Sequence, residues 1–220
     1  MRRLPLMVAV LAAMLTAGCH DRRAGVEQYG KKLPYDNWNF SFIYPKNLPA
    51  LVTMVYLEDG DIRESIFRRL DPMDSSDLSV GRWHDVMGGY GGYFNRGKAV
   101  PVRMTVCWDS VIDKKAYETE IWFGQETWQQ MTTAFPDPYH PGKPYYRNRM
   151  AVGLAPGGTV RVWLEDNGNP SVRQQPARQL TLTGNDMLIC KGITKHPNGY
   201  VYYGKTPDFI KGKTYPYGDW

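Results

Sequence analysis

Apolar and polar residues alternate in several short stretches of the chain, and a period of two residues is typical of β-strands. Aromatic and polar residues alternate over 38–44, and a mainly apolar stretch follows at 51–57. Both stretches are rich in residue types that favour strands, and turn-forming residues follow each of them. The pattern predicts strands over 38–44 and 51–57, whereas residues 62–70 fit either a short helix or a strand.

The clearest alternation lies in the middle of the chain. Over 100–108, apolar side chains fall on one face of an extended chain, while Arg103 and Cys107 fall on the other. A second alternating stretch covers 114–123 and places Glu118 and Glu120 on one face. These two stretches predict neighbouring strands joined by the short turn between them.

The spacing then changes to that of a helix. Trp128, Met131 and Phe135 share one helical face within 125–135, and Pro136 ends the pattern. Further on, two apolar segments flank a Pro-Gly-Gly turn within 150–164, which predicts a β-hairpin.

Glycine, proline and tyrosine are frequent in the stretches 71–99 and 136–148, which predicts loops there. Shorter strand candidates lie at 179–183, 187–191 and 200–203. Taken together, the elements predict a mainly β protein, with an α+β protein as the alternative. The expected architecture is an antiparallel β-sandwich or a curled sheet with one short helix packed on it.

The first 18 residues have the layout of a secretory signal peptide, with a positively charged start, an apolar run and then small residues. The apolar run is about a dozen residues long, whereas a membrane-spanning helix needs roughly 20. We therefore expect residues 1–18 to be removed. Residues 19–36 are polar and lack apolar periodicity, which predicts a flexible tether, and we expect 37–220 to form a single β-rich domain.

A cysteine directly follows the small residues of this segment, which an ordinary signal peptide does not require. The residues Leu15-Thr16-Ala17-Gly18-Cys19 resemble the lipobox of bacterial lipoproteins, with Thr16 where leucine is usual. The resemblance implies lipid attachment at Cys19. Because His20 and not aspartate follows the cysteine, it also implies sorting to the periplasmic face of the outer membrane. The alternative is an accidental cysteine beside an ordinary cleavage site.

Composition limits the partners that this domain can have. The formal net charge of +5 falls to +3 when Arg2 and Arg3 are removed, and this surplus is too small for a nucleic-acid-binding face. Aromatic residues make up 13% of the chain, with 15 Tyr and 7 Trp. Such residues favour strands and protein interfaces, so the composition favours a protein partner over nucleic acid.

Cys107 and Cys190 are the remaining cysteines and form a candidate disulfide pair, because thiols often pair in an oxidising compartment. A bridge between them would close a long loop and contribute about 4 kcal/mol in the chain-entropy model. The alternative is two unpaired cysteines that serve as small apolar residues.

The sequence lacks the common motifs of catalysis and metal binding. Its four histidines are far apart, and neither HExxH, CxxC nor G-x-S-x-G occurs. Glu118 and Glu120 form a solvated stripe more often than a catalytic pair, and the glycine–tyrosine run at 88–93 lacks the ending of a phosphate-binding loop. We expect no catalytic residues, no metal and no cofactor, and hence a protein that is not an enzyme.

Several segments occur together in one order: the lipobox, the Val102–Val106 strand with Trp108-Asp109-Ser110, the segment Lys114–Tyr117, and Ala151–Leu164. This combination resembles domain-of-unknown-function family 2931, which consists of small lipoproteins of Gram-negative bacteria. The resemblance covers roughly residues 37–165, and its most specific piece is GLAPGGTVRVWL. The family offers no established catalytic residues to transfer.

The resemblance implies a function in protein binding. Such lipoproteins are often encoded beside phospholipase effectors of type VI secretion, and several act, or are thought to act, as immunity proteins. The implied partners are a secreted lipase effector and, through the N-terminal lipid, the membrane. The candidate contact residues lie in three aromatic-rich regions: Trp83, Tyr90, Tyr93, Phe94, Tyr139, Tyr145, Tyr146, Tyr217 and Trp220.

Two other functions stay open. One is a structural or envelope-maintenance lipoprotein that binds another envelope component. The other is an enzyme of an unrecognised kind, which would require polar residues such as His84, Asp109 and Glu118 to converge in one pocket.

Overall fold

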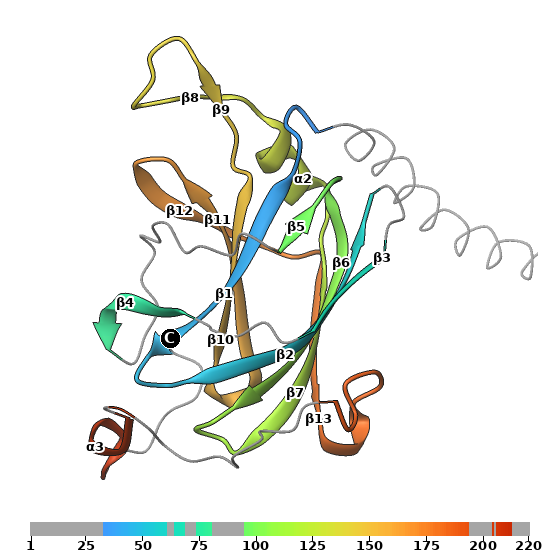
Figure 1. The fold of residues 1–220 in the computed structure, drawn as a ribbon, viewed down its shortest axis with the longest axis vertical. Helices are drawn as coiled ribbons and strands as arrows, with labels where there is room; N and C mark the ends of the chain where they lie inside the picture. The colour runs from blue at the N-terminus through green and yellow to red at the C-terminus, as the bar shows by residue number, and fades with distance from the viewer. Residues whose placement is uncertain are drawn as a thin grey trace, which may run out of the picture.

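The computed structural model describes residues 33–60, 64–68, 74–80, 95–193, 204 and 206–212. Most of these residues lie in short β-strands that form two packed sheets and a small two-stranded ribbon (Figure 1). The expectation of a mainly β protein with packed sheets is therefore confirmed.

Six strands form the first sheet: β1 (Trp38–Lys46), β4 (Asp74–Val80), β5 (Arg96–Gly97), β10 (Arg149–Ala155), β11 (Thr159–Asp166) and β12 (Asn169–Gln174). Strand β1 runs parallel to both β10 and β4, whereas β10, β11 and β12 pair antiparallel. The hairpin expected over 150–164 is formed by β10 and β11. It turns through η1 (Pro156–Gly158), where Gly157 and Gly158 adopt positive φ angles that favour glycine.

Five strands form the second sheet, which is antiparallel throughout: β2 (Ala50–Asp59), β3 (Glu64–Arg68), β6 (Pro101–Ser110), β7 (Lys115–Trp122) and β13 (Arg178–Thr183). The order is β13-β7-β6-β2-β3. Strands β6 and β7 are the two alternating stretches at 100–108 and 114–123. The ambiguous stretch at 62–70 contains strand β3.

The core lies between the sheets, because each sheet turns its apolar positions toward the other. It contains side chains from β1, β2, β6, β7, β10 and β11. Trp108 is fully buried there, stacks on Tyr117 at 4.7 Å between ring centroids and donates its Nε1 hydrogen to Thr119. Buried indole groups of this kind combine a large apolar area with one satisfied polar atom.

Helix α2 (Gln125–Thr132) covers one end of the core and is the helix expected from the change of spacing. Trp128 and Met131 are buried in the core, and Trp128 donates to the Pro101 carbonyl at 2.7 Å. The helix ends before Phe135, which instead lies in strand β8 (Phe135–Pro136). The expectation that Phe135 shares the buried helical face is wrong, because Thr133 already has an extended backbone.

Strand β8 pairs with β9 (Pro144–Tyr145), and the two form a ribbon that projects beyond the sheets (Figure 1). The loop expected over 136–148 thus contains short strand pairing. Two further short elements are η2 (Gly184–Asp186) and helix α3 (Thr206–Ile210).

The packed domain begins before the expected boundary at residue 37. Leu33 is 6% exposed and belongs to the core, and the Tyr35 hydroxyl donates to the Met131 carbonyl at 3.0 Å. The predicted tether therefore has to end before Leu33, because Leu33 packs in the core and Tyr35 binds α2.

Two local expectations are also wrong. The stretch 71–99 was expected to be a loop, but it contains β4 and β5. Strand β4 (DSSDLSV) has little apolar alternation and is held by backbone pairing with β1. The stretch 187–191 was expected to be a strand, but it forms bends after η2 on the outer face of the second sheet.

Candidate functional site

The β8–β9 ribbon carries one of the expected contact residues at its tip. Tyr139 is 65% exposed. Asp137 orders the turn, since its Oδ1 accepts the backbone N–H of Tyr139 at 2.9 Å and that of His140 at 3.3 Å. The hydrogen bond from the Tyr139 N–H, assisted by His140, holds the pKa of Asp137 below its ordinary value. The ribbon therefore presents Tyr139 from an ordered turn.

The other two described tyrosines of this region serve the fold. The Tyr145 hydroxyl donates to Asp166, and the Tyr146 ring lies 5.4 Å from that of Tyr35. Arg147 binds the same Asp166 through Nε at 3.1 Å and Nη2 at 2.6 Å, and its guanidinium lies 3.8 Å from the centre of the Phe135 ring. These contacts fix the base of the ribbon and leave Tyr139 as the exposed aromatic side chain of the three.

The remaining residues that the sequence suggests for lipid attachment or partner contact lie outside the described residues: Cys19, Trp83, Tyr90, Tyr93, Phe94, Tyr217 and Trp220. The same holds for His84, so the convergence of His84 with Asp109 and Glu118 is not described either.

The outer face of the second sheet is a candidate surface that the sequence did not single out. Strand register places its side chains in three rows that cross β2, β6, β7 and β13. The rows are Met54–Cys107–Glu118–Leu182, then Tyr56–Thr105–Glu120–Leu180, then Glu58–Arg103–Trp122–Arg178. Each row joins residues that are far apart in the sequence, so the surface exists only once the sheet has formed.

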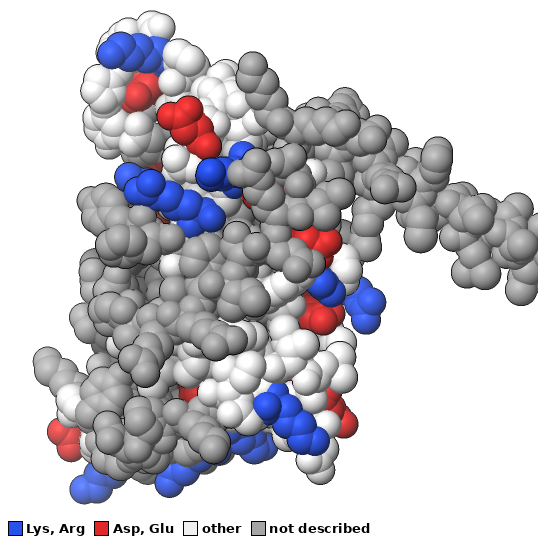
Figure 2. Space-filling view, turned by 45° about the vertical axis from the view of Figure 1, so that its right-hand side comes forward, with Lys and Arg blue, Asp and Glu red and all other residues white. Residues whose placement is uncertain are grey.

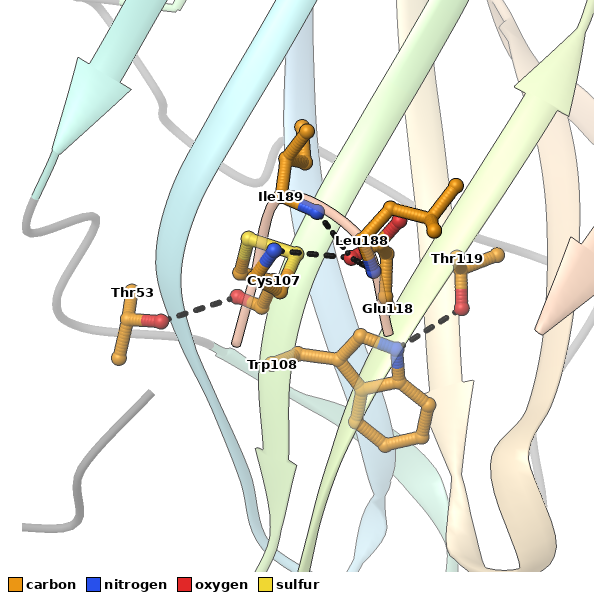
Figure 3. Close-up of a disulfide and its surroundings, with 8 residues drawn as sticks. Thr53, Cys107, Trp108, Glu118, Thr119, Leu188 and Ile189 are labelled. Carbon is orange, nitrogen blue, oxygen red and sulfur yellow. Dashed lines mark hydrogen bonds between the residues drawn. A yellow bond between two sulfur atoms is a disulfide. The ribbon is translucent and has the colours of Figure 1, made fainter. Parts of the chain in front are cut away.

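Residues 184–193, which we name the pinned segment, cover the first row. A disulfide joins Cys107 of β6 to Cys190 of the segment (Figure 3). Met187 and Cys190 are buried against Met54 and Cys107 in a small second apolar cluster. The candidate pair Cys107 and Cys190 is thus bonded in the structure, and the bond attaches the segment to the middle of the sheet.

A buried carboxylate provides a second attachment beside the disulfide. Glu118 is fully buried, and its Oε2 accepts the backbone N–H groups of Leu188, Ile189 and Cys190 at 2.9, 2.9 and 2.8 Å (Figure 3). A carboxylate that accepts three N–H bonds makes up for the loss of its hydration, and such charge-assisted bonds are stronger than neutral ones. Glu118 therefore has a structural role in place of the solvated or catalytic role weighed from its spacing.

The two attachments hold large apolar side chains in water. Leu188 is 72% exposed and Ile189 is 46% exposed, although their backbone N–H groups are bound to Glu118. Ile193 is 40% exposed at the end of the segment. Single exposed apolar residues are common, but a group of them on a fixed backbone marks an interaction surface.

The second and third rows together form an arginine cluster, in which Glu58, Arg103 and Trp122 of the third row lie beside Tyr56 of the second. The Arg103 guanidinium lies 5.4 Å from the Tyr56 ring centre and 5.0 Å from that of Trp122. Its Nε lies 3.1 Å from Glu58 Oε2, and both side chains of this pair are 28% exposed. The arrangement holds a partly exposed guanidinium between two aromatic rings.

Neither the pinned segment nor the arginine cluster is predicted from the sequence. The alternation of β6 did place Arg103 on the face opposite the core, but its partners on β2 and β7 depend on register. The apolar residues of Met187–Cys190 have a composition typical of a strand. Cys190 is the signal that could have indicated otherwise, because a disulfide to the outward-facing Cys107 requires its segment to lie on the outside of the sheet.

Two other kinds of site are absent from the described ranges. No cluster of three or more His, Cys, Asp or Glu side chains there could hold a metal ion. No helix of this part of the chain is long and apolar enough to cross a membrane.

Comparison with known proteins identifies one family. Residues 24–218 match the family model described as "Protein of unknown function (DUF2931)". The match extends past Leu164, where the sequence resemblance ended, and includes the pinned segment. No curated protein and no solved structure matches the chain.

Proposed function

This chain belongs to the DUF2931 family, and from that premise we propose that it is a lipid-anchored periplasmic immunity protein. In this proposal it binds and neutralises a phospholipase effector delivered by type VI secretion. The signal peptide layout and the lipobox ending at Cys19 support the anchor and the compartment. The association of similar lipoproteins with lipase effectors supports the choice of partner.

The arginine cluster is the observation that carries the proposal. Tyr, Trp and Arg are the residue types most enriched in the energetic centres of protein interfaces. Here they lie on an ordered sheet, with the guanidinium already held between the rings, so little side-chain freedom is lost when a partner covers them. The half-exposed ion pair with Glu58 leaves charge available for a complementary partner.

An inhibitor of this kind needs a stable surface and no chemistry of its own. A two-sheet sandwich supplies the stable surface, and attachment to the membrane keeps the inhibitor close to the phospholipid that an incoming lipase attacks. Confinement of this kind raises the effective concentration of the inhibitor without any added contact. Tyr139, at the tip of the β8–β9 ribbon, is a second candidate contact.

The test is capture from the producing strain by the full chain, followed by a phospholipase assay on what is retained. We expect a secreted phospholipase to bind in a fixed ratio and to lose activity. Arg103→Ala should weaken that binding by about 2 kcal/mol, or roughly 30-fold in Kd, as expected for an arginine at the centre of an interface.

Arg173→Ala is the matched control, because Arg173 is exposed on β12 of the other sheet. It should leave the affinity unchanged. Retention of envelope components without any phospholipase would refute the immunity function and favour an envelope-maintenance lipoprotein. Equal effects of the two arginine variants would place the contact elsewhere.

A further inference from the structure

The pinned segment has a combination of features that effector binding does not explain. Its backbone is fixed by Glu118 and by the disulfide, its Met187 side chain is buried, and Leu188 and Ile189 point into water. We propose that the pinned segment is a membrane-contact site, which inserts Leu188 and Ile189 into the surface of an anionic lipid bilayer.

The fixed backbone prevents Leu188 and Ile189 from turning toward the sheet and becoming buried. Rotation of the segment toward the sheet would remove the three N–H groups from Glu118 Oε2 and would pull Met187 and Cys190 out of the second apolar cluster. The exposed leucine and isoleucine are therefore a property of the folded protein, and a nonpolar environment has to come from outside the domain.

The chemistry of the segment fits lipid better than a protein cleft. Its exposed apolar side chains are aliphatic, and leucine is under-represented in the energetic centres of protein interfaces. Leucine on an apolar side, with lysines beside it, is typical of segments that lie at a bilayer surface. The aromatic and arginine side chains that suit a protein partner lie in the other two rows of the same sheet face.

The charges around the segment complement an anionic bilayer. Lys191 is exposed within the segment, and Lys114 and Lys115 are exposed directly before Ala116, which packs against the second apolar cluster. Asp186 is the exposed acidic residue of the segment, so positive charge exceeds negative charge among these residues. Figure 2 shows Lys and Arg side chains at the lower end of the molecule, where Figure 1 places the turn between β6 and β7, as well as over its upper part.

The inference goes beyond the proposed function, because it needs neither an effector nor an attached lipid. Each lysine close to an anionic surface increases binding by about fivefold. Insertion of the two aliphatic side chains adds at least another factor of about ten. The contact would orient the domain on the membrane, whereas an N-terminal lipid alone leaves its orientation free.

The test uses the chain expected after removal of residues 1–18, with Cys19→Ser, so that neither the apolar signal peptide nor an acyl chain binds the vesicles. Flotation with phosphatidylglycerol–phosphatidylethanolamine vesicles should recover this chain at low salt, and recovery should fall as salt screens the lysines. Vesicles of phosphatidylcholine should recover much less. The double variant Leu188→Ser/Ile189→Ser should bind the anionic vesicles at least about tenfold more weakly. Leu180→Ser, at an exposed leucine of β13 outside the pinned segment, is the matched control and should bind as the parent does.

Near-ultraviolet circular dichroism of each variant checks that the fold is intact. Failure of the parent chain to bind anionic vesicles would overturn the proposal, and so would equal binding by the double variant. If the double variant instead keeps vesicle binding and loses a captured phospholipase, the pinned segment is a protein contact. The result with Arg103→Ala reports on the proposed function independently.

Discussion

Glu118 offers the sharpest test of how the outer surface is built. Replacing it with alanine removes one acceptor and leaves three backbone N–H groups, those of Leu188, Ile189 and Cys190, without it. A hydrogen bond to a charged group contributes about 1.5–3 kcal/mol. The N–H groups of Leu188 and Ile189 are only partly buried and can bind water instead, whereas that of Cys190 is buried. The bond to Cys190 should therefore contribute fully and the other two only in part. We expect Glu118→Ala to lower the free energy of unfolding by about 3 kcal/mol.

The glutamine variant separates charge from shape. Glu118→Gln keeps an oxygen that can accept the same N–H groups but removes the negative charge. The second carboxylate oxygen, Oε1, has no hydrogen-bond partner among the described residues, so the amide NH2 of glutamine would be a buried donor without an acceptor. We expect a loss of about 2 kcal/mol, smaller than that of the alanine variant because one set of hydrogen bonds persists.

Urea unfolding followed by tryptophan fluorescence measures both losses, and amide hydrogen exchange shows where they arise. The amides of residues 188–190 should lose protection in Glu118→Ala while β6 stays protected up to the global limit. Glu120→Ala is the control, because Glu120 lies two residues away on the same strand face and only partly buried. It should change stability by no more than about 0.5 kcal/mol. A loss below about 1 kcal/mol in Glu118→Ala, or unchanged protection at 188–190, would refute the role assigned to this carboxylate.

Three further predictions concern the rest of the fold. Cys190→Ala removes a bridge between residues 83 positions apart and should cost about 4 kcal/mol; urea unfolding of the variant and of the dithiothreitol-reduced parent should agree. Burial, and next the neighbouring Tyr146, raise the pKa of Tyr35 well above its ordinary value. The contribution of Tyr35 to the free energy of unfolding is therefore complete at neutral pH. It declines as the pH rises above about 10, because Tyr35 ionises in the unfolded chain before it ionises in the folded protein. Tyr35→Phe should therefore lose about 1 kcal/mol at pH 8, through the missing bond to Met131, and a smaller difference at pH 11 than at pH 8 would confirm the coupling. Gly97→Ala would place a Cβ 2.2 Å from the fully buried Trp38 ring and should lower stability by about 2 kcal/mol or more, seen as a lower Tm; an unchanged Tm would show that the ring can move.

Sequence patterns predicted the strands whose two faces differ in environment. Strands β1, β2 and β7 alternate between buried and partly exposed positions, so their sequence alternation reports burial directly, and the Pro-Gly-Gly turn indicated the β10–β11 hairpin. Strand β4 has little such signal because it is held to β1 by backbone pairing, which most residue types support. The parallel partners of β1 were not predictable for the same reason, since pairing between distant strands leaves no local pattern.

The candidate sites were not predictable either, because they too depend on contacts between distant parts of the chain. The residues of the arginine cluster come from three strands and are brought together only by register. In the pinned segment, apolar residues from Met187 to Cys190 mimic a strand, but Glu118 accepts the N–H groups that a neighbouring strand would otherwise bind. A side chain from elsewhere in the chain thus replaces a sheet ladder, and the backbone donors remain satisfied.

The parallel pairing of β1 with β10 also determines when the protein can fold. Strand β1 is synthesised first among the described strands, yet Asn39 pairs with Arg149, so β1 has to wait for most of the chain before its central position in the sheet is filled. Pairing over such a distance slows folding, because the entropy of closing a long loop is lost before any stabilising contact forms. During that interval β1 can pair with β4 and β5, but the edge of β1 that later binds β10 stays open, which exposes the growing chain to aggregation. Truncations that end before β10 should therefore accumulate as insoluble protein and not as a stable smaller domain.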